Sequence, residues 1–399
     1  MKKPELLAPA GNLEKLKLAC IYGADAIYLG GKQYGLRSNS DNFSIEEIKE
    51  GVEFAKQYDV KIYVTTNIYA HQENYQGFKE FVIDLEKAGV IGIIVSDPGY
   101  IKIAQENTNL EIHISTQHSI TNKLAVKQYQ KLGYDRVVLA RELTFEEIKD
   151  VTDNCDIEVE VFIHGAVCSS YSGRCTLSNF MTMRDSNRGG CCQSCRWDYE
   201  IYQDNKLIEL NKEESLFTMS CKDLNLIYHI PELMQLNVAS FKVEGRMKSH
   251  HYVATVIKVY RLAIDSYLED KENYVVKKEW VEEIKKAESR ETYEGAPANN
   301  FDVEAMIFDS QYKVKDVEYT GIVLDYNQDT NLAYIEERNH FKVGDELEFF
   351  GPKTSFKQVI NKIYDQDMNE IKRVYNPLAK VYVLLDNKVE ANWLIRKEK

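Results

Sequence analysis

The sequence predicts an α/β fold: a TIM-like (β/α)8 barrel with a cysteine-rich insertion, followed by a small C-terminal β-barrel domain. Two features predict the first domain, because eight short apolar runs alternate with helical patterns and most of these runs end on polar side chains. A third feature predicts the second domain: from about Tyr319 the pattern changes to short alternating runs separated by Gly, Asn and Asp. The length of 399 residues also favours two domains.

The eight apolar runs are the expected barrel strands. They cover residues 5–11, 25–31, 61–67, 91–97, 111–117, 136–142, 158–165 and 240–246. Two of the stretches between them, residues 44–58 and 144–151, space their apolar side chains at helical intervals. Both begin with Ser or Thr followed three residues later by Glu, a capping box that favours the start of a helix.

Polar side chains stand where most of these runs end. They are Asn67, Asp97, Gln117, Arg141, Glu142, His164, Glu244 and Arg246. The carboxyl ends of barrel strands carry the active site, so these side chains are expected to converge on one mouth. A single polar residue at a strand end is equally well explained by solvation. Polar residues at the ends of most of the predicted strands together favour an active site at this mouth.

A long insertion, at about residues 166–239, separates the seventh run from the eighth. It is far longer than an ordinary βα connection, and long loops in compact domains are usually functional. It contains six of the eight cysteines: Cys168, Cys175, Cys191, Cys192, Cys195 and Cys221. The other two, Cys20 and Cys155, fit helical and pre-strand patterns and are expected to be inert.

The cysteine spacing is compatible with more than one chemistry. It reads Cys168-x6-Cys175-x15-Cys191-x3-Cys195. Four thiolates from one loop can bind either zinc or an iron–sulfur cluster, and the wide, uneven spacing favours the cluster. A nucleophilic cysteine with His164 as its base is an alternative, although five close cysteines exceed what that chemistry needs.

After the eighth run, residues 250–270 and 277–288 have helical patterns, and residues 293–301 have the composition of a linker. We therefore expect the barrel with its trailing helices at 1–292, a linker at 293–318 and the C-terminal β-barrel at 319–399. No segment approaches the roughly 18 apolar residues of a membrane span, and the N-terminus lacks the apolar core of a secretory signal. A cytoplasmic protein is expected, in which clustered cysteines indicate metal or redox chemistry rather than disulfides.

A sequence signature around the first cysteines is highly specific. The pattern E-x-F-x-x-G-[SA]-[LIVM]-C-x4-G-x-C-x-[LIVM]-S is matched by Glu160, Phe162, Gly165, Ala166, Val167, Cys168, Gly173, Cys175, Leu177 and Ser178. By this signature the chain resembles peptidase family U32, also called the collagenase-like proteases. The resemblance continues through residues 184–197, 220–227 and 241–249 and into the closing β module.

This resemblance implies two kinds of activity. The older label of the family implies a protease, yet no HExxH, GxSxG or paired-aspartate signature is present in the chain. Other members resemble oxygen-independent hydroxylation proteins that act on tRNA wobble uridine, on a ribosomal cytidine or on ubiquinone precursors. Those relatives imply a [4Fe–4S] cluster and, for the RNA enzymes, prephenate as co-substrate. The implied ligands are Cys168, Cys175, Cys191 and Cys195, with Cys192 or Cys221 as rivals.

Charge leaves room for a local anion site. The net charge of −13 disfavours a surface that coats nucleic acid. Basic residues nevertheless gather near the cysteines: Arg174, Arg184, Arg188, Arg196, Lys222, Lys242, Arg246 and Lys248. Such a collar suits phosphates or a dicarboxylate, although about half of these side chains are expected simply to be solvated. Tyr171 and Trp197 can stack on a base or pack in the protein.

The sequence and the resemblance together predict RNA hydroxylation, with 5-hydroxyuridine formation at the tRNA wobble position as the leading reaction. The predicted catalytic residues are His164, Glu244 and Arg246, and the predicted cofactor-binding residues are Asn67, Gln117, Arg141 and Arg174. Arg246 is expected to be needed for chemistry but not for folding, because it stands at a strand end. Expected partners are tRNA and a second subunit of the family. A U32-type protease and a cluster-bearing accessory subunit remain the alternatives.

Overall fold

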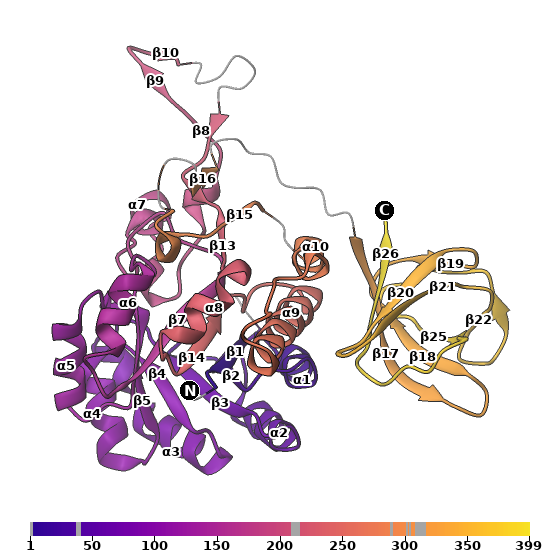
Figure 1. Ribbon diagram of the computed structural model, residues 1–399, viewed down its shortest axis with the longest axis horizontal. Helices are drawn as coiled ribbons and strands as arrows, with labels where there is room; N and C mark the ends of the chain where they lie inside the picture. The colour runs from indigo at the N-terminus through magenta and orange to yellow at the C-terminus, as the bar shows by residue number, and fades with distance from the viewer. Residues whose placement is uncertain are drawn as a thin grey trace.

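The computed structural model describes residues 3–36, 41–208, 216–287, 290–300, 302, 305–307 and 317–399. Eight parallel strands close into a barrel (Figure 1). They are β1 (Glu5–Pro9), β2 (Ala26–Gly30), β3 (Lys61–Thr66), β4 (Gly92–Val95), β5 (Glu111–Ile114), β6 (Arg136–Val138), β7 (Glu158–Gly165) and β14 (Ser240–Val243). β14 pairs with both β7 and β1, which closes the ring. Every predicted run contains one of these strands, so the predicted TIM-like fold is confirmed.

Helices cover the outside of the barrel. They are α1 (Leu13–Ile21), α2 (Ile45–Lys56), α3 (Phe78–Ala88), α4 (Pro98–Asn107), α5 (Lys123–Lys131), α6 (Phe145–Thr152), α8 (Ile230–Gln235), α9 (His250–Glu269) and α10 (Lys278–Ala287). Both predicted capping boxes form: Ser44 and Glu47 begin α2, and Thr144 and Glu147 begin α6. Each box satisfies backbone N–H groups that lack a partner in the first helical turn. No helix among the described residues is long and apolar enough to cross a membrane.

The insertion lies above the carboxyl ends of the strands (Figure 1). Its elements are short: α7 (Leu177–Thr182), β8 (Tyr199–Glu200), β9 (Tyr202–Gln203), β10 (Lys206–Leu207), β11 (Leu216–Phe217), β12 (Ser220–Cys221), β13 (Asp223–Asn225) and the 3-10 turns η3 (Ser186–Arg188), η4 (Ser194–Arg196) and η5 (Ile227–His229). β13 pairs antiparallel with the end of β7, so the insertion returns directly to the barrel.

The predicted linker contains secondary structure of its own. β15 (Thr292–Tyr293) extends the barrel sheet by pairing with β13, and β16 (Met306–Ile307) pairs with β12. Between them lies a 3-10 turn, η6 (Ala296–Ala298). The composition of this segment indicated a linker because strands of two residues leave no periodic pattern. The described parts of this segment are therefore attached to the insertion.

The C-terminal module is an eight-stranded antiparallel sheet curved into a half-barrel, which confirms the predicted all-β domain. Its strands are β17 (Val317–Asn327), β18 (Leu332–Glu337), β20 (Glu346–Phe350), β21 (Ser355–Val359), β22 (Ile363–Tyr364), β23 (Glu370–Ile371), β25 (Lys380–Leu384) and β26 (Leu394–Glu398), with β19 (Phe341–Lys342) and β24 (Arg373–Val374) forming a separate pair. Between β21 and β22 lies the buried Ile360.

The two domains share a packed interface beside α1, α9 and α10 (Figure 1). The Tyr22 hydroxyl donates a hydrogen bond of 2.6 Å to the carbonyl of Phe350. Arg396 is fully buried there and binds Glu283 of α10 and Glu348 of β20. Because Glu283 belongs to the barrel domain and Arg396 to the β module, this ion pair crosses the interface between them.

Candidate active site

A cavity of about 850 Å³ lies between the carboxyl ends of the barrel strands and the insertion. Its floor consists of side chains inside the barrel: Tyr28, Ile94, Val138, Phe162 and Lys242. Its roof is built from residues between Ala166 and Asp198 of the insertion. This is the place where barrels of this class carry their active sites, because loops from different strands meet there.

Five cysteines of the insertion line this cavity: Cys168, Cys175, Cys191, Cys192 and Cys195. Burial raises the pKa of the Cys195 thiol, and Cys168, Cys191 and Cys175 are close enough to raise it further. Among the described residues, no three Cys, His, Asp or Glu side chains are arranged to hold a single metal ion. A zinc ion needs its sulfur ligands within about 2.3 Å, whereas thiolates around a four-iron cluster each bind a different iron and lie farther apart. Four cysteine sulfurs on one cavity are a donor set that an iron–sulfur cluster takes.

The two rival cysteines are engaged elsewhere. The Cys192 thiol donates to the carbonyl of Gly190 at 3.3 Å and lies 3.3 Å from the hydroxyl of Thr182. Cys221 is buried and lies 3.6 Å from the sulfur of Met306, outside the cavity lining. Burial, with Cys168 and Cys195 nearby, raises the pKa of Cys221 to about 11. Cys192 lines the cavity but its thiol already has hydrogen-bond partners, and Cys221 lies outside the lining, so the positions favour the other four cysteines as candidate ligands.

Buried serines hold the cysteine segments together. The Ser178 hydroxyl accepts a hydrogen bond of 3.1 Å from the backbone of Cys192 and lies 3.2 Å from the Ser194 hydroxyl. The Ser186 hydroxyl donates to the carbonyl of Cys175 at 2.6 Å. These serines are at most 8% exposed. Ser178 ends the sequence signature, whereas Ser186 and Ser194 stand in no pattern that indicates hydrogen bonds between distant loop segments.

The strand-end predictions divide into two groups. Asn67, Gln117, Arg141, Glu244 and Arg246 all line the cavity, as expected for carboxyl ends of barrel strands. Asp97 and Glu142 do not: Asp97 caps α4, and Glu142 accepts a hydrogen bond of 2.8 Å from the backbone of Ser172. Asp97 and Glu142 therefore have local structural roles, whereas Arg141, beside Glu142, faces the cavity.

Arg246 lines the cavity, but it is built into the barrel wall. It is 3% exposed, donates to the Thr65 hydroxyl at 3.1 Å and donates to the side chain of Asn42. Gly30 makes room for it, because a Cβ at that position would lie 2.2 Å from Nη2 of Arg246. The expectation that Arg246 can be removed without affecting folding does not fit this burial. Truncation would leave a void and remove partners from buried polar groups.

Two predicted residues lie away from the cavity. His164 is 1% exposed, contacts the Tyr260 hydroxyl at 3.4 Å and packs against the rings of Tyr252 and Tyr260 of α9. It does not line the cavity. Arg174 is exposed and donates to the Ser119 hydroxyl at 3.0 Å, which ties the insertion to the barrel. The structure therefore gives His164 and Arg174 positions that favour structural roles over the predicted catalytic and binding roles.

His164 leads to a pH prediction. Burial lowers its pKa from 6.5 to about 4. Between these pH values the unfolded chain binds a proton at His164 that the folded chain does not, so this residue makes the free energy of unfolding fall as the pH drops. The free energy of unfolding of wild type, relative to that of His164→Gln, should therefore fall by roughly 2–3 kcal/mol between pH 7 and pH 4. Urea unfolding at both pH values measures this difference. The exposed His71→Gln should show no such change. A stability difference between wild type and His164→Gln that does not change with pH would contradict the burial of His164.

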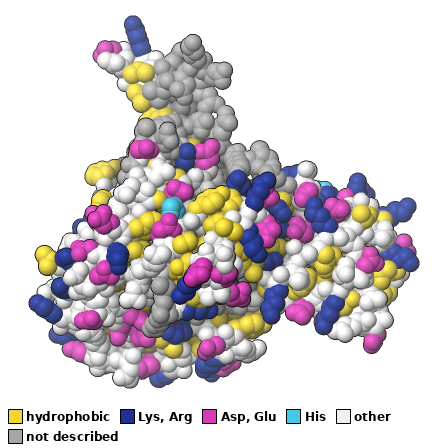
Figure 2. Space-filling model, viewed as in Figure 1, with side chains coloured by type: hydrophobic (Ala, Val, Ile, Leu, Met, Phe, Trp, Pro, Cys, Tyr) yellow, Lys and Arg dark blue, Asp and Glu magenta, His cyan; other side chains and the backbone are white. Residues whose placement is uncertain are grey.

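The cavity is basic although the chain is acidic. Its lining contains seven cationic side chains: Arg141, Arg184, Arg196, Lys242, Arg246, Lys248 and Arg290. It contains two acidic ones, Asp198 and Glu244. On the face seen in Figure 2, by contrast, basic and acidic side chains are interspersed, as expected for a net charge of −13. The lining thus carries more cationic than acidic side chains, although Lys242, Lys248 and Arg290 are paired with the buried carboxylates of Glu160 and Asp223. Partly exposed Tyr171 and Trp197 also stand in the lining.

Comparison with known proteins places the chain among a well-defined set of relatives. Residues 11–302 match peptidase family U32, and residues 315–396 match the C-terminal domain of that family. The chain is 52% identical over 407 residues to tRNA hydroxylation protein P1 of Bacillus subtilis, covering 100% of this chain and 96% of that protein. It is 32% identical to tRNA hydroxylation protein P of Escherichia coli, covering 88% and 87%. It is also 31% identical to a collagenase of Porphyromonas gingivalis, covering 90% and 89%.

Proposed function

The chain belongs to peptidase family U32, and we propose that it is a tRNA-modifying hydroxylase of that family. The proposed reaction is the formation of 5-hydroxyuridine at the wobble position of cytoplasmic tRNA, without molecular oxygen. The proposed cofactor is a [4Fe–4S] cluster, and the proposed co-substrate is prephenate. The observation that carries this proposal is the convergence of four cysteines and seven cationic side chains on one cavity of an acidic protein.

The cavity supports hydroxylation better than proteolysis. A cysteine protease needs a base within hydrogen-bond reach of its nucleophile. His164 was the candidate base, and it is buried against α9 outside the cavity. Among the described residues that line the cavity there is no histidine at all. The cavity lining therefore offers no histidine base for a cysteine nucleophile, although a relative from Porphyromonas gingivalis is named a collagenase.

The side chains of the cavity have distinct proposed tasks. Cys168, Cys175, Cys191 and Cys195 would hold the cluster, which supplies electron-transfer chemistry when bound. Exposed Arg184 and half-buried Arg196 stand in the roof and would bind backbone phosphates. Trp197 is 40% exposed in the same lining and offers a ring on which a splayed base can stack. Because phosphate contacts release counterions, binding of tRNA should weaken steeply with salt.

The proposal is tested by the nucleoside profile of tRNA from a deletion strain that has no other member of the family. Nucleosides derived from 5-hydroxyuridine should disappear and should return when the wild-type chain is restored. Unchanged levels in that strain would overturn the assignment of the substrate. Purified protein should also leave gelatin intact, with or without zinc. Gelatin cleavage that is lost in Cys168→Ser would favour the protease instead. A second family subunit, if required, should co-purify with the active form.

A further inference from the structure

A second, smaller cavity lies beside the one lined by cysteines. Its volume is about 290 Å³. One wall is the connection from β3 to α3, which supplies Ile68 and Asn74, and the other wall is the insertion loop at residues 184–190. Arg184 belongs to the lining of both cavities, so the two are neighbours. A ligand that occupies one of them can therefore continue into the other.

The insertion loop that lines this second cavity is held by its own hydrogen bonds. The Asp185 carboxylate accepts a hydrogen bond of 2.8 Å from the backbone of Asn187, and the Asp185 carbonyl accepts one of 2.7 Å from Gly190. Asn187 also donates to the carbonyl of Cys175 at 3.0 Å and accepts from the backbone of Tyr69 at 3.0 Å. The loop is thus anchored both to a cysteine segment and to the β3–α3 connection. One oxygen of Asp185, the acid in the lining, is occupied by this anchoring.

Two arginines and one amide offer donors at the second cavity. Nη2 of Arg188 donates to Glu73 at 2.7 Å and to the side-chain oxygen of Asn74 at 3.0 Å. The same Asn74 oxygen accepts a hydrogen bond of 2.9 Å from the backbone of His71. Two donors therefore fix the orientation of this amide and leave its NH₂ group for another acceptor. Arg184 is exposed and lines the cavity with a second guanidinium group.

The ion pair of Arg188 lies at the protein surface. The side chain of Glu73 is 67% exposed and that of Arg188 is 27% exposed. Glu73 does not line the cavity, whereas Arg188 does. Because exposed ion pairs contribute little to stability, an anion in the cavity can share Arg188 with Glu73, or replace Glu73, at small cost. A phosphate group suits this position, since a guanidinium binds phosphate oxygens in a bidentate manner.

We propose that the second cavity binds a backbone phosphate of an RNA strand whose neighbouring nucleotide enters the cavity lined by cysteines. Arg188 and Asn74 bind the phosphate, and Arg184 contacts the strand between the two cavities. A volume of about 290 Å³ has room for a phosphate and its ribose, just below the range of ordinary ligand pockets. Contacts to phosphates set the position of a strand without reading its bases, so this contact fixes which nucleotide faces the cysteines. The inference rests on the proposed function in that the strand belongs to the tRNA substrate.

Binding of a fluorescently labelled tRNA anticodon stem-loop to the full chain tests this contact without any reaction. Arg188→Gln should weaken binding about tenfold, because a charge-assisted contact is lost. It should also reduce the slope of log Kd against log salt by about 0.7, the contribution of one phosphate contact to a single strand. Lys17→Gln is the matched control: Lys17 pairs with exposed Glu50 at 2.8 Å, its side chain is 30% exposed, and it lines neither cavity.

Glu73→Gln should have the opposite effect on binding. It removes a negative charge beside the bound phosphate, so it should tighten binding of the stem-loop about twofold at low salt. A misfolded variant cannot produce such a gain. Glu50→Gln is the control, since Glu50 is 57% exposed and pairs with Lys17 away from both cavities. If the Arg188–Glu73 pair only connects the insertion to the barrel, Glu73→Gln should leave binding unchanged or weaken it.

Three results would overturn the inference: binding that Glu73→Gln does not tighten, a salt slope that Arg188→Gln does not alter, and displacement of the stem-loop by an equal concentration of uridine monophosphate. The last result would assign the cavity to a free nucleotide. Binding that depends on Arg188, together with unchanged nucleosides in the deletion strain, would contradict the proposed function alone. Loss of the nucleosides in that strain, together with binding that does not depend on Arg188, would contradict this inference alone.

Discussion

Replacing Cys168 with Ser is expected to remove both the proposed iron–sulfur cluster from the purified protein and the proposed hydroxylated nucleosides from cellular tRNA. Cys168 is exposed in the cavity, close enough to Cys195 to influence its pKa. A serine hydroxyl does not ionise as a thiol does, so it is a poor replacement for a cluster ligand. The protein should therefore lose its brown colour and broad visible absorbance, with iron and sulfide measured on anaerobically purified samples.

Matched variants sharpen this test. Cys155→Ser changes a half-buried cysteine that lies 3.7 Å from the carbonyl of Lys123, far outside the cavity lining, so iron should be retained. Cys192→Ser should also retain iron, because its thiol already donates to Gly190. Loss of iron in Cys192→Ser but not in Cys191→Ser would mean that Cys192, rather than Cys191, is the cluster ligand. Stoichiometric zinc without iron or sulfide in the wild type would rule out the cluster.

The barrel could be predicted from the sequence because its strands are continuous apolar runs that alternate with amphipathic helices. A strand buried on both faces forms a continuous apolar run, which can be identified from the local sequence alone. The cavity-lining strand ends Asn67, Gln117 and Arg141 followed from the same rule, since parallel strands in a barrel end at one mouth. Periodicity, strand polarity and cysteine spacing are local properties, and these predictions depended on nothing else.

Predictions about individual side chains were weaker where distant segments decide the environment. His164 ends a strand as Gln117 does, but β13 pairs beside it and α9 packs over it. Arg246 is buried because Gly30 and Asn42, more than two hundred residues away, leave space and a partner for it. Lys242 was counted only as one of the basic residues near the cysteines, since no sequence pattern reveals that Glu160 faces it across the barrel.

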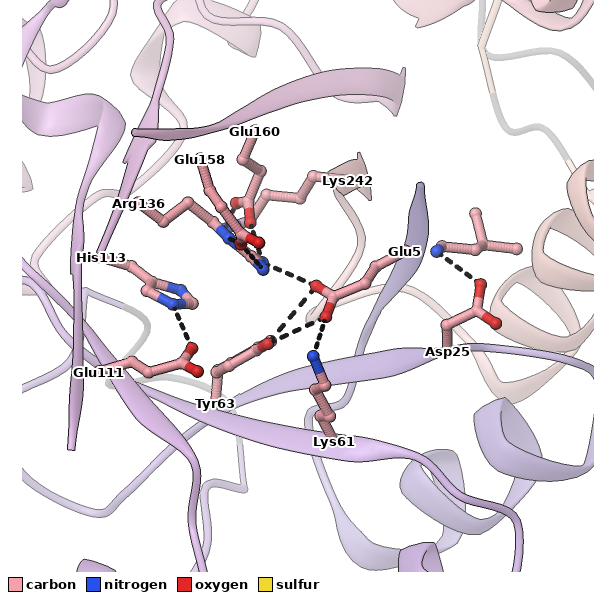
Figure 3. A network of polar contacts seen from close by, with 11 residues as sticks. Glu5, Asp25, Lys61, Tyr63, Glu111, His113, Arg136, Glu158, Glu160 and Lys242 are labelled. Atoms are coloured by element: carbon pink, nitrogen blue, oxygen red, sulfur yellow. Dashed lines mark hydrogen bonds and ion pairs between the residues drawn. The ribbon is translucent and has the colours of Figure 1, made fainter. Parts of the chain in front are cut away.

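An ion-pair network inside the barrel makes a large effect on stability the expected result of Arg136→Met. Arg136 is 1% exposed and lies near three carboxylates, those of Glu5 at 2.8 Å, Glu158 at 2.7 Å and Glu160 at 3.4 Å (Figure 3). Methionine fills much of the volume but supplies no charge. Glu160, fully buried, would then have Lys242 as its remaining cation, and removing one partner of a buried ion pair costs about 3–5 kcal/mol.

Urea unfolding should therefore show Arg136→Met destabilised by about 3–5 kcal/mol relative to wild type. Lys149→Met removes an exposed pair at 2.8 Å between α6 and Asp153, the residue that caps its C-terminus, and it should cost only about 0.3–0.5 kcal/mol. A cost below about 1 kcal/mol for Arg136→Met would mean that water reaches these carboxylates. The network could then not keep the Lys242 ammonium fixed at the cavity floor.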